Sequence, residues 1–217
     1  MQQIIKGNEP TELAEYKRKN PTHRYDDLGE DLEQIRPTIR QACLDEQSYL
    51  CAYCCRQIGL KDHDCMNEHI LPRQRYPQYS FDFTNIVASC TAKGSCDDVK
   101  DNHQITISPI SPRCETEFEF NISGTIKGLT DDAKQTIEVL KLGESFQQNK
   151  KLVEIRNQAI MNYLVSQGIN PNDPVEVLDD DLLSLLIEDL QQVTDGKLQP
   201  FAPIITKALK NWIDGNK

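Results

Sequence analysis

Two pairs of cysteines, Cys51-x2-Cys54 and Cys90-x5-Cys96, stand 35 residues apart in the first half of the chain. Thiolates with such short spacings can converge on one ion, and four of them complete the tetrahedral shell of Zn²⁺. Sulfur would then fill every coordination position, so we predict a structural zinc rather than a catalytic one. The alternative is a set of unrelated buried cysteines. Cys55 and Cys65 lie close to these pairs in sequence, so the exact set of zinc ligands stays open. Cys43 and Cys114 are expected to be small buried residues of the core.

An acid–histidine pair, Glu68-His69, lies inside the loop that this zinc would close, just ahead of Pro72. A histidine with a pKa of about 6.5 can take a proton from an attacking water near neutral pH. Glu68 and Asp97 are short carboxylates suited to Mg²⁺ or Mn²⁺, which can offset the charge that builds on a phosphodiester during hydrolysis. Asn85 or a backbone carbonyl could set the tautomer of the histidine.

Three basic residues flank these positions and are candidates for phosphate contacts: Arg73, Arg75 and Lys100. Such contacts position a nucleic acid without reading its sequence. Taken singly, each candidate has a plainer role. The arginines could form a solvated rim, Asn85 could occupy a turn or cap a helix, and His69 could be a structural neighbour of the zinc. The order of the residues favours the nuclease interpretation.

In this order the residues resemble the HNH (ββα-metal) endonucleases. That family's pattern runs Cys-x-x-Cys, an acid–His dipeptide before x-x-Pro, Asn-hydrophobic-x-x-x-Cys, and Cys-(His or Asn)-x-x-Lys. The matching positions here are Cys51 and Cys54, Glu68-His69, Asn85 with Cys90, and Cys96-Asp97 with Lys100. The resemblance implies a structural Zn²⁺, a catalytic Mg²⁺ or Mn²⁺ held by Glu68 and Asp97, and catalytic roles for His69 and Asn85.

The sequence departs from the family pattern in two places. The second cysteine pair carries three extra residues, within the segment 91–95. The position that is usually His or Asn is Asp97, which is a competent oxygen ligand for a hard divalent cation. Asn102 and His103 are close enough in sequence to compete for the same role. The identity of the third ligand therefore stays open at this point.

The flanking sequence extends the resemblance to the HNH subunit of Septu-type and retron-associated anti-phage defence systems. The matching segments are 5–16, 47–54, 109–118, 136–140 and 152–156. This resemblance implies an ABC/SMC-like ATPase as partner and nucleic acid as substrate, with both DNA and tRNA open as targets. A retron reverse transcriptase and its DNA product are further candidate partners.

The elements that must position these residues are predicted as follows. Apolar spacing indicates a helix from about Pro37 to Gln47, with proline in its first turn. Strands are expected at 105–108 and 117–121, with a turn at Ser123-Gly124. From Thr130 onward the pattern is helical, with stretches beginning near 130, 146, 173 and 203.

Together these features predict an α+β fold: a zinc-stapled ββα-metal module with a small β-hairpin, and a C-terminal helical domain. We place an N-terminal basic segment and helix at 1–50, the module at 51–128 and an acidic helical domain at 129–217. The basic segment includes Lys17, Arg18, Lys19 and Arg24.

The net charge of −10 argues at first against a nucleic-acid substrate. Its distribution weakens that objection, because residues 157–196 hold eight acids and no Lys or Arg, and the other 177 residues carry a net charge of only −2. A surface of this kind would repel phosphates, so it should face away from the active site. It suits a basic partner surface, and we expect residues near 173–195 to contribute to the ATPase interface.

The chain has no apolar stretch of the ~18 residues that a membrane span needs. Its first residues lack the apolar core of a secretory signal, so a cytoplasmic location and no membrane contact are expected. The competing hypothesis to the nuclease is a non-catalytic, zinc-stabilised module that binds nucleic acid or the ATPase. Such an adaptor would need the cysteines and the basic residues but would have no use for Glu68-His69.

Overall fold

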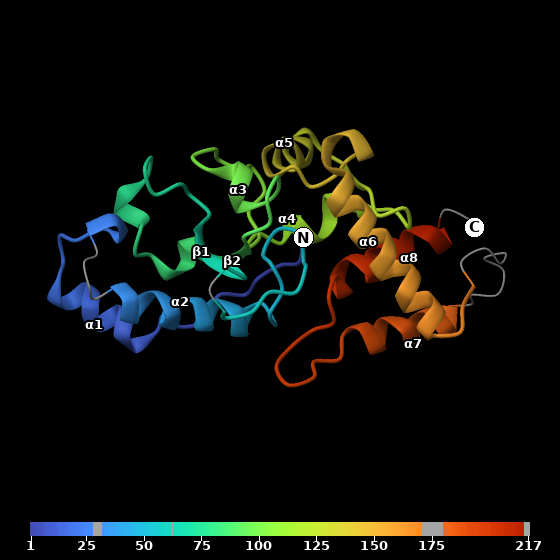
Figure 1. The fold of residues 1–217 in the computed structure, drawn as a ribbon, viewed down its shortest axis with the longest axis horizontal. Helices are drawn as coiled ribbons and strands as arrows, with labels where there is room; N and C mark the ends of the chain where they lie inside the picture. Colours follow the sequence, from blue (N-terminus) through green and yellow to red (C-terminus); the bar gives the residue numbers. More distant parts are fainter. Residues whose placement is uncertain (28–31, 62, 171–179, 215–217) are drawn as a thin grey trace.

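The computed structural model describes residues 1–27, 32–61, 63–170 and 180–214. Short antiparallel strands and helices make up a mixed fold, which confirms the predicted α+β class (Figure 1). The helices and strands are α1 Thr11–Lys19, α2 Leu32–Glu46, β1 Cys65–His69, β2 Ile86–Cys90, α3 Asp97–Lys100, α4 Arg113–Thr116, β3 Phe118–Phe120, β4 Ile126–Gly128, α5 Asp131–Leu140, α6 Phe146–Ser166, α7 Asp180–Leu190 and α8 Ala202–Asp214.

The central element is the antiparallel hairpin of β1 and β2, in which Glu68 pairs with Val87 and His69 with Ile86. The one-turn helix α3 follows β2, which gives the order strand, strand, helix. All five residues of β2 are buried. The amide of Gln47, just beyond α2, both donates to the Ala88 carbonyl oxygen and accepts from the Ala88 N–H, at 2.8 Å each. Helix α2 is thereby fixed against the strand that carries Cys90.

The second hairpin, β3 and β4, turns at Gly124, as the Ser123-Gly124 signal predicted. The prediction of a strand at 105–108 is wrong, because those residues pair with no strand of the described structure. Their backbone N–H groups find side-chain acceptors on α5 instead. The Thr106 N–H donates to Gln135 Oε1 and the Ile107 N–H donates to Thr136 Oγ1, both at 3.0 Å.

Helix α2 also differs from its prediction, since it begins at Leu32 and contains Pro37 inside it. Proline removes one backbone N–H and one intrahelical hydrogen bond. The helix tolerates the loss because Ile35, Ile39, Cys43 and Leu44 are all buried against the rest of the molecule. Burial of this apolar face outweighs the local penalty of the proline.

The C-terminal helices follow the predicted pattern where the structure describes them. Thr130 Oγ1 accepts from the Ala133 N–H at 3.2 Å and so caps α5. Ser145 caps α6 in the same way, and α6 is kinked at Asn149. The stretch predicted to begin near 173 is described only from Asp180, the first residue of α7.

The helices at the C-terminus pack directly on the N-terminal half. The Leu198 N–H donates to the Ser48 carbonyl at 3.1 Å, and the Phe201 N–H donates to the Cys55 carbonyl at 2.9 Å. Met1 is buried, and Lys207 Nζ donates to its carbonyl oxygen at 3.3 Å. The division of the chain at residues 50 and 128 stays a prediction. No helix among the described residues is long and apolar enough to cross a membrane.

We expect Gly124→Ala to destabilise the fold strongly. Gly124 has φ +85°, and an added Cβ would lie 2.2 Å from the Val153 carbonyl oxygen on α6. Backbone strain of this kind costs about 1–3 kcal/mol, and the clash adds to it. Gly168→Ala is the matched control, because Gly168 has φ +73° with nothing within 4 Å. Denaturant unfolding should show a larger loss of unfolding free energy for Gly124→Ala, and equal losses would contradict the proposed close approach.

Candidate active site and structural metal centre

The four predicted zinc ligands converge on one point. The sulfurs of Cys51, Cys54, Cys90 and Cys96 lie within 4.8 Å of one another, and all four residues are buried. The Cys51–Cys96 and Cys54–Cys90 sulfur distances are 4.0 and 3.8 Å. Zn–S bonds of about 2.3 Å in a tetrahedron place sulfurs about 3.8 Å apart. The residues therefore fit a structural zinc, as predicted.

The other four cysteines lie outside this cluster. Burial raises the pKa of Cys43 to about 12 and the pKa of Cys55, Cys65 and Cys114 to about 11. These four residues are buried thiols, and their positions place them outside the group of sulfurs that could share one ion. The cluster also has nearby donors, since the Cys90 N–H and Arg56 Nε approach the sulfurs of Cys51 and Cys54 at 3.3 and 3.4 Å.

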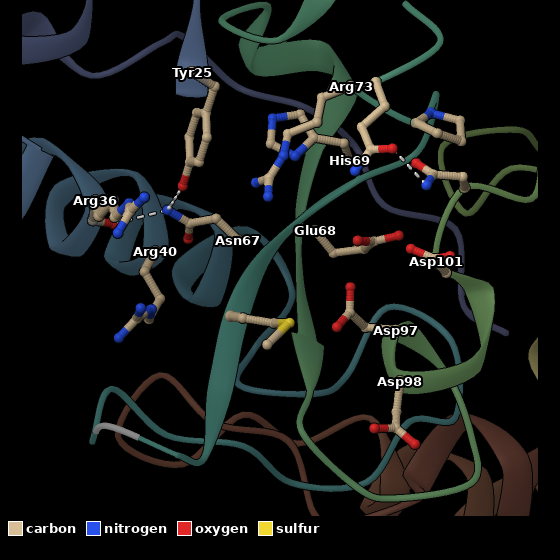
Figure 2. A pocket seen from close by; sticks show the side chains of 14 residues that line it. Tyr25, Arg36, Arg40, Asn67, Glu68, His69, Arg73, Asp97, Asp98 and Asp101 are labelled. Atoms are coloured by element: carbon tan, nitrogen blue, oxygen red, sulfur yellow. Dashed lines mark hydrogen bonds between the residues drawn. The ribbon is translucent and has the colours of Figure 1, made fainter. Parts of the chain in front are cut away.

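A cleft of about 490 Å³ opens beside the β1–β2 hairpin (Figure 2). Its two sides differ in charge. Arg36 and Arg40 reach it from α2, whereas acidic side chains line the opposite side, where α3 lies (Figure 2). The acidic residues are Glu68, Asp97, Asp98 and Asp101. A cleft with cationic and anionic sides suits a phosphate on one side and a divalent cation on the other.

The carboxyl groups of Glu68 and Asp97 lie near each other among the acidic residues of the cleft, and each affects the pKa of the other (Figure 2). Burial and the neighbouring Glu68 raise the pKa of Asp97 to about 8. Burial alone would raise the pKa of Glu68, but the Asp97 carboxyl and the cation of Lys100 outweigh it, and the pKa is lowered. Two adjacent carboxylates repel each other when both are ionised. A divalent cation bound between Glu68 and Asp97 would offset this repulsion, so the pair fits such an ion.

The expectation that Lys100 contacts a phosphate is corrected by its position. Lys100 is fully buried, and its Nζ lies 2.7 Å from Glu68 Oε1 and donates to the His69 carbonyl oxygen at 2.8 Å. Tyr53, also buried, donates from its hydroxyl to the same Glu68 oxygen at 3.1 Å. These two donors fix the carboxylate of Glu68 and leave its second oxygen for a cation.

His69 is 4 % exposed and lines the cleft. Its Nε2 lies 2.9 Å from the Ser80 carbonyl oxygen. A carbonyl oxygen only accepts, so Nε2 carries the proton and Nδ1 keeps a lone pair. Burial lowers the pKa of His69, which holds the ring neutral at pH 7. A backbone carbonyl thus sets the tautomer, which is one of the two possibilities left open by the sequence.

Asn85 has a different task from the one the sequence suggested. Its Oδ1 accepts from the Leu71 N–H at 2.7 Å, and its Nδ2 donates to the carbonyl oxygens of Leu71 and Tyr79 at 3.2 Å. It therefore ties together the two ends of the loop between β1 and β2. Because Ser80 follows Tyr79, Asn85 acts on His69 through the backbone that holds the imidazole.

The remaining candidates separate by position. Arg73 lines the cleft and pairs with Asp26 at 3.1 Å, whereas Arg75 is exposed and does not line it. Of the candidates for the third motif position, Asp97 contacts Glu68 and Asn102 lines the cleft. His103 is exposed and its Nδ1 lies 3.1 Å from the Lys100 carbonyl oxygen. Geometry thus favours Asp97 as the ligand beside Glu68.

Sequence reasoning missed several residues of the site. Tyr25, Arg36 and Arg40 come from segments that precede the motif, and Tyr53 lies between the first two cysteines without being a motif position. Ser80 contributes a backbone atom, which no side-chain pattern reveals. The only available signal for Arg36 and Arg40 was their spacing of four residues, which places two cations on one face of a helix.

We expect Cys54→Ser to lose the metal and destabilise the module, because the energy of zinc binding contributes to folding. Cys55→Ser is the matched control, since Cys55 is equally buried and adjacent but lies outside the cluster. Elemental analysis of protein purified without chelators should find one zinc per chain in the control. Absence of zinc from the wild-type protein would overturn the assignment.

For Asn85→Ala we expect a loss of about 1–3 kcal/mol in unfolding free energy, because the Leu71 N–H loses its acceptor in a part-buried setting. Cleavage should fall as well, since the loop that carries the Ser80 carbonyl loosens. Thermal unfolding and nuclease assays measure the two effects. An unchanged unfolding midpoint would show that Asn85 does not hold this loop.

Comparison with known proteins gives independent support for this geometry. No protein-family model matches the chain. The chain is 28% identical over 129 residues to a protein of Vibrio cholerae serotype O1 biovar El Tor that is named as the inferred HNH endonuclease of retron Vc95. The match covers 55% of this chain and 62% of that protein, so the chain spans less than two thirds of the relative's length. The chain is thus distantly similar to a protein named as an HNH endonuclease, and it has the order strand, strand, helix and a four-cysteine cluster.

Proposed function

We propose that this protein is a metal-dependent HNH endonuclease that hydrolyses phosphodiester bonds in nucleic acid. The observation that carries the proposal is the arrangement in one cleft of a neutral His69, its Nε2–H held by a backbone carbonyl, beside the Glu68–Asp97 carboxyl pair. The cofactors are a structural Zn²⁺ on the four cysteines and a catalytic Mg²⁺ or Mn²⁺. The similarity to a retron HNH endonuclease supports nuclease activity in general.

The proposed mechanism follows from the fixed positions of the side chains. Nδ1 of His69 accepts the proton of a water that attacks the phosphorus, and Nε2 stays bound to the Ser80 carbonyl throughout. Glu68 and Asp97 would hold the divalent cation, which offsets charge on the phosphate oxygens and on the leaving oxygen when bound. Lys100 and Tyr53 keep Glu68 ionised and oriented. Asn85 is a positioning residue that holds the loop behind the imidazole.

A non-catalytic binding module explains this site less well. Zinc and surface cations would serve such a module, but burying a histidine, two carboxyls and a lysine at one point costs desolvation energy and contributes nothing to docking. Their convergence is instead what acid–base chemistry requires. We therefore favour the enzyme over the adaptor.

The proposed biological role is that of the effector subunit of a Septu-type or retron-associated anti-phage defence complex. The sequence resemblance supports an ABC/SMC-like ATPase as partner, and the name of the Vibrio relative supports a retron context with its reverse transcriptase and DNA product. DNA and tRNA are both candidate substrates. We propose a cytoplasmic location for this complex.

Helix α7 carries most of the described acidic residues of this segment and lies at the other end of the long axis from α1 (Figure 1). Asp173, Glu176 and Asp179 fall outside the described residues. Asp189 is engaged within the protein, because Tyr163 donates its hydroxyl to Asp189 Oδ2 at 3.0 Å. Asp181 and Glu188 are exposed, and we propose that this end of the molecule contacts the ATPase.

We expect His69→Ala to keep its zinc and its fold but to lose cleavage by about 10²–10⁴-fold, because the general base is removed. Nicking of supercoiled plasmid and cleavage of tRNA, each with and without added Mg²⁺ or Mn²⁺, measure the effect and compare the two substrates. His103→Ala is the control, since His103 is exposed and does not line the cleft. Undiminished cleavage by folded His69→Ala would remove this residue from the mechanism.

For the partner surface we expect reversal of Asp179, Asp180 and Asp181 to slow association with the ATPase, with an effect that shrinks as salt rises. Surface plasmon resonance at low and high ionic strength measures the association rate. Unchanged binding at low salt would show that the acidic segment is not the docking surface. The region from Tyr16 to Arg24 would then be the next candidate.

A further inference from the structure

Three guanidinium groups gather around the cleft from parts of the chain that are distant in sequence. Arg36 and Arg40 lie on α2, and Arg73 lies in the loop after β1. Four residues of α-helix rise about 6 Å, so Arg36 and Arg40 stand one turn apart along the cleft wall. Neither belongs to the motif that carries the proposed chemistry, because both precede the first cysteine pair.

Tyr25 links this group of arginines to the candidate base. The guanidinium carbons of Arg36 and Arg73 lie 5.6 and 5.4 Å from the centre of its ring. The ring of His69 meets the Tyr25 ring edge-on at 4.7 Å. Tyr25 is 3 % exposed, and its hydroxyl accepts from Asn67 Nδ2 on β1 at 3.1 Å. Tyr25 thus places Arg36 and Arg73 relative to His69.

Crowding cations in one cleft is electrostatically unfavourable unless an anion occupies it. The acids on the other side do not serve as that anion. Glu68 is paired with Lys100, Asp98 is paired with Lys93, and Asp97 is a proposed ligand of the catalytic cation. Arg73 also has an ion pair with Asp26, whose side chain is 60% exposed. Arginine forks match phosphate geometry closely, so the expected anion is a phosphate.

We propose that Arg36, Arg40 and Arg73 bind consecutive phosphates of the substrate strand next to the scissile one. The N-terminal segment is then part of the substrate-binding site rather than a separate appendage. This inference rests on the proposed nuclease function but concerns binding, so it can be tested without cleavage. Backbone phosphates are shared by all nucleic acids. The three arginines, here called the arginine clamp, would therefore set the affinity and the position of the substrate, and would not select its base sequence.

The test is the salt dependence of binding in the His69→Ala background. A fluorescently labelled DNA duplex and the matching single strand are titrated at several salt concentrations. Arg36→Ala/Arg40→Ala should weaken binding and lower the slope of log affinity against log salt by about 0.9 per arginine on the duplex, or about 0.7 per arginine on the single strand. Arg36→Lys/Arg40→Lys keeps both charges and should restore most of the slope.

The matched control is Arg18→Ala/Lys151→Ala, which also removes two exposed cations but away from the cleft. Zinc content and thermal unfolding confirm that each variant is folded. A slope equal to that of the control, or a loss of affinity that is independent of salt, would overturn the proposal. If wild type binds through these arginines but does not cut, the clamp holds and the catalytic proposal fails instead.

Discussion

The four-thiol centre is the constraint on which the rest of the site depends. It joins the turn at Cys51 and Cys54 to the end of β2 at Cys90 and to the residue before α3, Cys96. Asp97 follows Cys96 directly, so the last sulfur also fixes where this carboxyl lies. On the other strand, Cys65 pairs with Cys90, and Glu68 lies three residues further along β1. The metal centre and the strand register together bring Glu68 and Asp97 into contact.

A second constraint is electrostatic. Glu68 is buried together with its two partners, Lys100 and Tyr53, and the half-buried Asp97 lies beside it in the cleft. A buried lysine is tolerated here because its ammonium has a carboxylate and a backbone carbonyl as partners. Removing either partner would leave a buried charge uncompensated, which costs far more than a surface ion pair contributes. The α3 turn is therefore tied to β1 by charge, while Cys96 places it beside Cys90 at the end of β2.

Sequence reasoning predicted the fold class, the four-cysteine centre and the helices that begin near residues 130 and 146, because each depends on local spacing or on residue type. It failed where tertiary contacts decide. The 105–108 segment has the composition of a strand, but α5 supplies its acceptors. Lys100 matches a motif position that suggested a phosphate contact, yet its burial is set by Glu68 and His69. The arginines of α2 could not be linked to the site until the helix was placed beside β1.

Cys96 has a backbone conformation that side chains rarely adopt, with φ +58° and ψ −130°. Such a conformation costs about 1–3 kcal/mol unless surrounding structure enforces it. Here the enforcing structure includes the sulfur's place in the metal centre, so the segment stores elastic energy while the thiols are held together. Loss of the ion would let that residue relax and carry the adjacent carboxyl away from its partner. Under the proposed function, removal of zinc would therefore disturb the position of Asp97 beside Glu68 as well as the fold around the thiols.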